Sequence, residues 1–229
     1  MALTVAIDGP SGSGKSTVAR AVAAARRLAY LDTGAMYRAA ACWVLDSGAA
    51  FDDLDGVAAL VRDMPLTVGL DPAGERFTLD GRDVTARIRE PEVSRVVSRV
   101  ATNLKARPLL VDWQRRLVAA EREPGGWSGG RGIVAEGRDI TTVIAPDAEV
   151  RILLTASEEA RLARRSLELS GSADASAVAA TRDQVVRRDR DDSTVASFME
   201  AADGVTLLDS SALTLEETIA RVLALVPEV

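Results

Sequence analysis

Nine residues near the start of the chain place glycines, a lysine and hydroxyl side chains in one short segment: Gly9-Pro10-Ser11-Gly12-Ser13-Gly14-Lys15-Ser16-Thr17. They match the pattern G-x-x-x-x-G-K-[ST] at every fixed position. The glycines let backbone N–H groups face a phosphate, and a helix that begins there adds partial positive charge. Lys15 is then placed to reach the β- and γ-phosphates, and the Ser16 hydroxyl to join a Mg²⁺ shell. The spacing predicts a nucleoside triphosphate site with ATP-type chemistry.

The segments on either side of this loop have the character that such a site needs. Residues 3–7 are apolar and β-branched, which is typical of a strand buried in a parallel sheet. Val18, Val22 and Ala25 recur afterwards at helical spacing. A glycine-rich turn that carries Lys-Ser by chance is the alternative, but the order strand, loop, helix favours the phosphate loop.

The composition excludes several kinds of chemistry. The chain has 229 residues and no histidine, so it has neither a Ser-His or Cys-His catalytic pair nor a histidine-ligated zinc. The single cysteine, Cys42, has no partner for an internal disulfide and is expected in the core. The net charge of −6 argues against a general nucleic-acid binder. Lysine occurs only at Lys15 and Lys105 against 28 basic residues in all, so basic side chains at a site must be almost entirely arginines.

The sequence also predicts where the protein works. No apolar run approaches the roughly 18 residues that span a bilayer. The first strand begins almost at once, which leaves no room for a signal peptide. We expect a cytoplasmic monomer whose partners are small-molecule nucleotides, with no nucleic acid and no membrane.

The elements that must position the loop alternate along the chain. Short apolar runs at 3–7, 28–31, 133–136, 150–154 and 205–208 predict five strands separated by helices, which is an open parallel sheet. The second run ends at Asp32-Thr33-Gly34 and the third at Glu136-Gly137-Arg138-Asp139, where open α/β sheets place ligand contacts. Thr155-Ala156-Ser157-Glu158 and Thr214-Leu215-Glu216-Glu217 fit capping boxes that open two later helices.

Residues 64–126 differ from this alternation. Segments 65–70 and 75–79 predict a hairpin around the turn Asp71-Pro72-Ala73-Gly74, and Asp80-Gly81 marks another turn. The repeat of Val93, Val96, Val97 and Val100 predicts a helix that begins near Pro91 and buries one stripe. A further helix is expected after Pro108. We predict an inserted α+β subdomain here, with the main core formed by residues 1–63 and 127–229.

Two arginine-bearing helices are predicted around a mobile loop at residues 170–178, which are rich in serine, alanine and glycine. The first helix carries Arg161, Arg164 and Arg165, and the second runs into the alternating charges of residues 187–192. Such charges are usually a solvated face. In a nucleotide-binding protein they also fit a lid, which we place at about 166–192.

A triphosphate site leaves several reaction classes open. A GTPase needs N-K-x-D, and Asn103-Leu104-Lys105-Ala106 does not supply it. A motor or transporter ATPase needs an apolar strand that ends in Asp or Asp-Glu, and none fits well. A small kinase remains, in which arginines position and neutralise phosphates. A phosphate acceptor needs no general base, whereas an alcohol acceptor would use Asp32 or Asp139.

Several blocks together resemble the bacterial cytidylate kinases, and the similarity covers essentially the whole chain. The blocks are residues 7–15, Leu31-Asp32-Thr33-Gly34-Ala35-Met36-Tyr37-Arg38, Glu136-Gly137-Arg138-Asp139, Pro146-Asp147-Ala148 and Arg188-Asp189-Arg190-Asp191-Asp192-Ser193. The first block is common to many kinases. The second and third, in this order around an insertion, are far more restrictive.

The resemblance implies a P-loop kinase three-layer sandwich that transfers the γ-phosphate of ATP to CMP or dCMP with Mg²⁺. It implies that Arg38 and Arg138 hold the acceptor phosphate, with Thr33 nearby. Ser98, Arg107 and Asp139 would read the cytosine edge. Arg188 and Asp192 would approach the sugar hydroxyls and the transferring phosphate, so that the catalytic set is Lys15, Arg138, Arg188 and Asp192.

Two positions depart from the family pattern. Val195 stands where these kinases have an arginine that contacts the pyrimidine, and Thr141 stands where glycine is usual. Loss of a hydrogen bond from a charged group, about 1.5–3 kcal/mol, would weaken acceptor binding roughly tenfold to a hundredfold. Two alternatives therefore stay open. One is a kinase for another small acceptor, either a different monophosphate or a shikimate-like alcohol. The other is a nucleotide-binding protein with weak transfer.

Overall fold

The computed structural model describes residues 2–172 and 174–228. A five-stranded sheet forms its centre, with strand order β2-β6-β1-β7-β8 and every pairing parallel. This confirms the predicted five-stranded parallel sheet. The strands are β1 (Leu3–Asp8), β2 (Ala29–Asp32), β6 (Gly132–Gly137), β7 (Val150–Thr155) and β8 (Thr206–Asp209).

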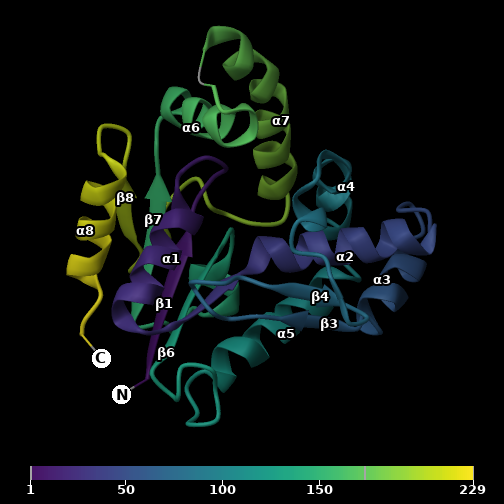
Figure 1. Ribbon diagram of the computed structural model, residues 1–229, viewed down its shortest axis with the longest axis horizontal. Helices are drawn as coiled ribbons and strands as arrows, with labels where there is room; N and C mark the ends of the chain where they lie inside the picture. Colours follow the sequence, from purple (N-terminus) through teal and green to yellow (C-terminus); the bar gives the residue numbers. More distant parts are fainter. Residues whose placement is uncertain (1, 173, 229) are drawn as a thin grey trace.

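Helices cover both faces of this sheet, which gives three layers (Figure 1). On one face, α1 (Lys15–Arg26) and α8 (Leu215–Leu225) pack against Val5, Ile7 and Val134. On the other, α2 (Thr33–Ser47) and α5 (Arg107–Ala120) pack against alternate residues of the same strands, such as Ala6 and Ala135. Successive residues of a strand point to opposite faces, so a strand buried on both sides must be apolar throughout.

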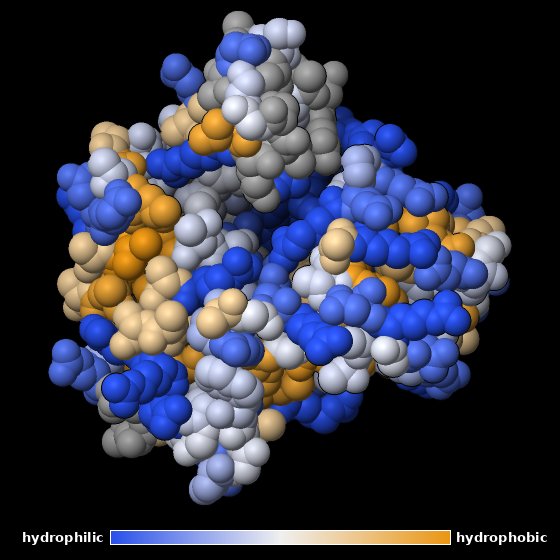
Figure 2. Space-filling model, in the orientation of Figure 1, coloured by the Kyte–Doolittle hydropathy of each residue, from blue (hydrophilic) through white to orange (hydrophobic). Residues whose placement is uncertain are grey.

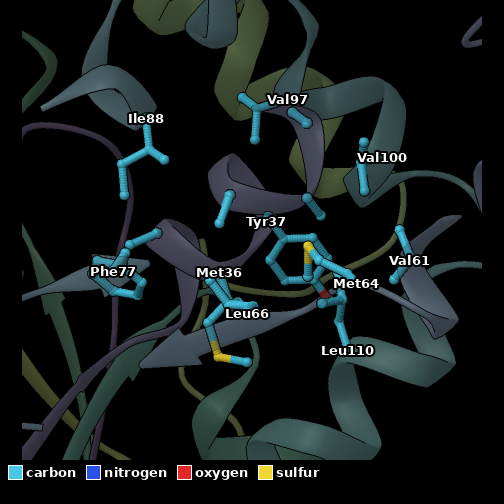
Figure 3. Packing of buried hydrophobic residues seen from close by; sticks show 14 of the residues in the cluster. Met36, Tyr37, Val61, Met64, Leu66, Phe77, Ile88, Val97, Val100 and Leu110 are labelled. Carbon is cyan, nitrogen blue, oxygen red and sulfur yellow. The ribbon is translucent and has the colours of Figure 1, made fainter. Parts of the chain in front are cut away.

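The inserted segment has a small antiparallel sheet of its own, in the order β3-β4-β5. It comprises β3 (Leu66–Val68), β4 (Phe77–Leu79), β5 (Arg82–Asp83), the 3₁₀ turn η1 (Arg87–Arg89) and α4 (Pro91–Ala101). The predicted hairpin and helix are confirmed, and Pro91 lies in the first turn of α4. Figure 3 shows Phe77, Ile88 and Val97 of this segment packed near Met36 and Tyr37 of α2, so the insertion shares its core with the main sheet.

Some elements were not predicted. Helix α3 (Leu54–Arg62) precedes the insertion, capped by the Asp53 side chain, which accepts from the Gly56 N–H at 2.9 Å. A single π-helical turn, η2 (Ile140–Ile144), follows β6. Strand β5 was also missed, because two residues carry no readable alternation.

Helices α6 (Glu158–Ser170) and α7 (Ala175–Ser193) form a hairpin that stands beyond the carboxyl ends of the strands (Figure 1). The predicted mobile loop at 170–178 was largely wrong, because α7 already begins at Ala175; Ala173 lies outside the described residues. Alanine has the highest helix propensity, which outweighs the serines of this segment. The first predicted capping box was wrong as well: Ser157, not Thr155, caps α6 by accepting from the Ala160 N–H at 3.2 Å. The box at Thr214 and Glu217 is confirmed.

Candidate active site

The glycine loop connects β1 to α1, in the order that the sequence predicts. Gly14 is the N-cap of α1 with φ +89°, a conformation that glycine adopts without a side-chain clash. Since glycine has no side chain to cap the helix, the N–H groups of the first turn stay available to an anion. Residues 11–18 line a cavity, whereas Gly9 and Pro10 are not among its lining residues.

This cavity has a volume of about 1000 Å³, at the upper end for small-molecule sites. It lies between the glycine loop, the carboxyl ends of β2 and β6, the insertion and the α6–α7 hairpin, where Figure 2 shows a hollow rimmed by hydrophilic side chains. Open parallel sheets bind ligands at this edge. A cavity of this size has room for a donor and an acceptor together.

A buried carboxylate, Glu136 at the end of β6, lies beneath the glycine loop. It accepts from the Ser16 Oγ at 2.6 Å and from the Tyr30 hydroxyl at 3.3 Å, and its Oε2 lies 4.0 Å from the Lys15 Nζ. Burial, with the neighbouring carboxylate of Asp32, raises the pKa of Glu136 to about 7. Burial and the charge of Arg138 lower the pKa of Lys15 to about 8. The sequence alone does not predict a role for Glu136, because nothing in its local pattern shows which donors surround it.

The strand register explains why these groups meet. Glu136 pairs with Ile7 on one side and with Asp32 on the other, so the ends of β2 and β6 lie beside the loop that follows β1. Asp32 caps α2 by accepting from the Ala35 N–H at 2.9 Å, and Arg89 lies 3.8 Å from its second oxygen. Both carboxylate oxygens of Asp32 are thus engaged, which disfavours its use as the general base of an alcohol kinase.

Three arginines, Arg38, Arg138 and Arg188, line the same cavity. Arg38 on α2 is buried and donates to the Ser94 Oγ at 2.8 Å. Burial and the charge of Arg188 lower the pKa of Arg38, while burial and the charge of Arg138 lower the pKa of Arg188. Burial and neighbouring positive charge both disfavour the charged guanidinium groups, and a bound phosphate would offset this cost.

Arg138 follows β6, and each of its guanidinium nitrogens has a protein partner. Its Nε lies 3.1 Å from Asp192 and its NH2 2.9 Å from Asp189, and its NH1 donates to the carbonyl of Gly9. The guanidinium also stacks on the Phe198 ring, 4.5 Å from the centroid. Such fixed contacts orient the planar fork toward the cavity that Arg138 lines.

The remaining predicted acceptor residues are only partly gathered. Arg107 and Asp139 form an ion pair beside the Tyr37 ring and line the cavity. Thr33 lines it too, and its Oγ1 donates to the Glu136 carbonyl at 2.8 Å. Ser98 is half-buried on α4 and is not among the lining residues, although Val97 and Ala101 of the same helix are.

The two departures from the family pattern have different settings. Val195 lines the cavity, so the position without its arginine does face the site. Thr141 is buried in the π-helical turn, where its Oγ1 donates to the Asp8 carboxylate at 2.7 Å and its N–H at 2.8 Å. The threonine therefore satisfies a buried charge, which glycine would leave with one partner fewer.

The oxygens near the glycine loop suit a hard cation. In the part of the chain that the structure describes, no three His, Cys, Asp or Glu side chains gather to hold a metal. Mg²⁺ is usually bound through one or two protein oxygens together with substrate phosphates. Ser16 and Glu136 meet that requirement.

None of the described helices is long and apolar enough to span a bilayer.

Comparison with known proteins agrees with this geometry. The family model described as Cytidylate kinase matches residues 5–228. A cytidylate kinase of Cutibacterium acnes is 47% identical over 98% of this chain and 96% of its own length. Those of Streptomyces avermitilis and Carboxydothermus hydrogenoformans are 44% and 37% identical, with 99% and 98% of this chain and 94% and 97% of the relatives aligned. The chain belongs to the cytidylate kinase family.

Proposed function

We propose that this protein transfers the γ-phosphoryl group of ATP to the phosphate of CMP or dCMP. One observation carries the proposal: the glycine loop and the arginines Arg38, Arg138 and Arg188 line the same cavity. In the reaction an acceptor phosphate oxygen bonds to the γ-phosphorus as the bond to the β-phosphate oxygen breaks, which releases ADP. Such transfer depends on position and charge more than on covalent chemistry.

On the donor side, the glycine loop would hold the triphosphate through the backbone of residues 11–17, which line the cavity, and Lys15 would reach the transferring group. Ser16 and Glu136 would hold Mg²⁺, which when bound neutralises charge on the phosphate oxygens. Glu136 also orients Ser16 through their 2.6 Å hydrogen bond. The Lys15 Nζ lies 4.0 Å from the other oxygen of Glu136, so the same carboxylate also stands beside the lysine.

On the acceptor side, Arg38 and Arg138 would hold the CMP phosphate, with Thr33 nearby. Arg107 and Asp139 would face the cytosine, since an exocyclic amine needs an acceptor and the ring O2 and N3 need donors. Ser98 would join them only if α4 shifts toward the cavity. Arg188 and Asp192 would contact the sugar and the transferring phosphate.

We also propose a division of labour between segments. Residues 64–126 would carry the acceptor, and residues 1–63 and 127–229 would form the core, within which about residues 166–192 would act as a lid. We propose that the protein acts as a monomer. ATP and CMP are cytoplasmic metabolites, which supports action in the cytoplasm.

Initial rates with Mg-ATP against CMP, dCMP, UMP and AMP test the proposal directly. We expect CMP and dCMP to be phosphorylated fastest. Much faster turnover of AMP or UMP would contradict the assignment of the acceptor. Lys15→Ala should lower kcat by roughly a hundredfold or more, because it removes a positive charge from the transferring group. If that loss fails to occur, the measured activity does not arise at this site.

A further inference from the structure

Asp189 on α7 accepts hydrogen bonds from three separate segments, although its sequence block gave it no role. Its Oδ1 accepts from the Ser11 N–H at 3.0 Å and from the Arg138 NH2 at 2.9 Å. Its Oδ2 accepts from the Arg161 NH1 at 2.5 Å. The side chain is buried, so water does not compete for these bonds.

The glycine loop is held from both sides through Ser11. While Asp189 accepts from the Ser11 N–H, Arg161 donates its NH1 to the Ser11 carbonyl at 2.9 Å. The next residue, Gly12, lies so near α6 that a Cβ there would meet the Arg161 carbonyl. The base of the α6–α7 hairpin is therefore fastened to the donor loop and not merely adjacent to it.

The same carboxylate also fixes Arg138, whose guanidinium is the proposed holder of the acceptor phosphate. Arg138 reaches the donor loop twice, through Asp189 and through the Gly9 carbonyl. One buried charge thus connects the loop for the donor phosphates with the arginine for the acceptor phosphate. Phosphoryl transfer needs the attacking and leaving oxygens in line, and small displacements of reacting groups lower the rate steeply.

We infer that Asp189 is a positioning residue, which sets the place of Arg138 relative to the glycine loop. The inference rests on the proposed function, because it assumes that Arg138 holds the acceptor. The two hydrogen bonds to Oδ1 have different roles. The bond from the Ser11 N–H supports the donor loop, and the bond from the Arg138 NH2 aligns the acceptor.

Asparagine keeps the shape of the side chain but removes its charge. In Asp189→Asn the amide oxygen can still accept from the Ser11 N–H and the Arg138 NH2, which both bond to Oδ1, but the charge that strengthens the bond to Arg138 is gone and the amide NH2 faces the Arg161 NH1. We expect kcat to fall about tenfold to a hundredfold and the KM for CMP to rise several-fold. The dissociation constant for ATP, measured without acceptor, should stay within about threefold. Asp189→Ala removes the hydrogen bonds to both Ser11 and Arg138 and should weaken ATP binding as well.

Asp191→Asn is the matched control. It also removes one negative charge, two residues along the same helix, but the Asp191 side chain is 38% exposed. It should leave kcat and both substrate affinities unchanged. The inference is overturned if folded Asp189→Asn keeps kcat within twofold of the native enzyme, if it loses ATP affinity as severely as kcat, or if Asp191→Asn loses as much. Thermal unfolding in each variant shows whether the protein is folded at the assay temperature.

Should the asparagine variant not fold, Asp189→Glu provides the second test, because it keeps the charge but displaces it by one methylene. It should lower kcat and raise the KM for CMP, because the displaced carboxylate no longer holds Arg138 in place, and an unchanged kcat and KM overturn the inference. Failure of the native enzyme to phosphorylate CMP contradicts the proposed function instead, so the two failures are distinguishable.

Discussion

At the scale of single residues, Lys15 and Glu136 form a buried pair whose pKa values are shifted toward each other. The pKa of Glu136 is raised to about 7 and that of Lys15 is lowered to about 8, in both cases mainly by burial. Neither charge is well solvated in the free enzyme. Triphosphate and cation would therefore enter a site where charge is already incompletely balanced, which favours their binding.

A pH profile checks this reading of Glu136. An exposed glutamate titrates near 4.5, whereas Glu136 takes up a proton as the pH falls through about 7 and then loses its charge. We expect kcat/KM for ATP to decline below pH 7 in the native enzyme. In Glu136→Gln the value should be about tenfold to a hundredfold lower at pH 8, and this part of the decline should disappear.

The substrate phosphates also titrate, near pH 6, but they do so identically with both proteins. The difference between the two profiles therefore isolates Glu136. If the pH profiles of the native enzyme and Glu136→Gln remain parallel from pH 6 to 8, the decline at low pH arises from the substrates alone.

Val195 permits a gain-of-function test, because it lines the cavity and the family resemblance implies an arginine at this position. Val195→Arg should lower the KM for CMP by roughly tenfold, as expected for a restored hydrogen bond from a charged group. Steady-state kinetics at saturating ATP measures this. Val186→Arg, at an exposed position outside the cavity lining, controls for added charge. An unchanged KM for CMP would mean that the lost contact is already compensated.

At the scale of elements, the approach of α6 to the glycine loop explains why Gly12 is a glycine. Its φ is +77°, and a Cβ would meet the Arg161 carbonyl. Gly171 at the end of α6 has a similar φ of +70° but open space around it. A side chain at Gly171 would therefore meet only backbone strain, whereas a side chain at Gly12 would meet backbone strain and close packing.

Gly12→Ala should therefore destabilise the protein more than Gly171→Ala. Both variants bear the left-handed penalty of about 1–2 kcal/mol, and only Gly12→Ala adds overpacking of about 1–3 kcal/mol. Urea unfolding of each variant gives the free energies of unfolding. Equal losses would show that α6 moves away from the loop at little cost.

At the scale of the whole molecule, Glu75 fastens the insertion to the core. It lies in the turn between β3 and β4, is largely buried, and accepts from Arg20 of α1 at 3.1 Å and from Arg89 at 2.5 Å. Nearby, the Tyr30 N–H of β2 donates to the Leu70 carbonyl at 2.9 Å. The insertion thus reaches the edge of the main sheet beside the donor site.

Removal of this contact should loosen the insertion selectively. In Glu75→Gln the two arginines lose their counter-charge, and we expect amide hydrogen exchange at residues 70–89 to become several-fold faster, with β1 and β6 unchanged. Arg76→Gln, which removes an exposed ion pair with Asp83 in the same hairpin, should have no such effect. Equal exchange in all three proteins would show that the apolar core alone holds the insertion.

Much of the fold was predictable because its signals are local. Each of the five parallel strands is a short apolar run, and each predicted helix has periodic apolar residues or a recognisable start. The order β2-β6-β1-β7-β8 was not predictable, since pairing between strands far apart in sequence leaves no local signal. Helix α3, the π-helical turn and the early start of α7 were missed because their sequences are short or ambiguous.

Most of the proposed donor side is determined by the sequence itself: residues 11–17 are consecutive and line the cavity, and their chemistry depends on a loop that their own glycines permit. The acceptor side depends on tertiary structure, because Arg38, Arg138 and Arg188 come from three distant segments. The roles of Glu136 and Asp189 emerge only there too. A buried carboxylate gains its function from the donors that surround it, and folding alone brings Ser16 and Lys15 to one carboxylate and Ser11 and Arg138 to the other.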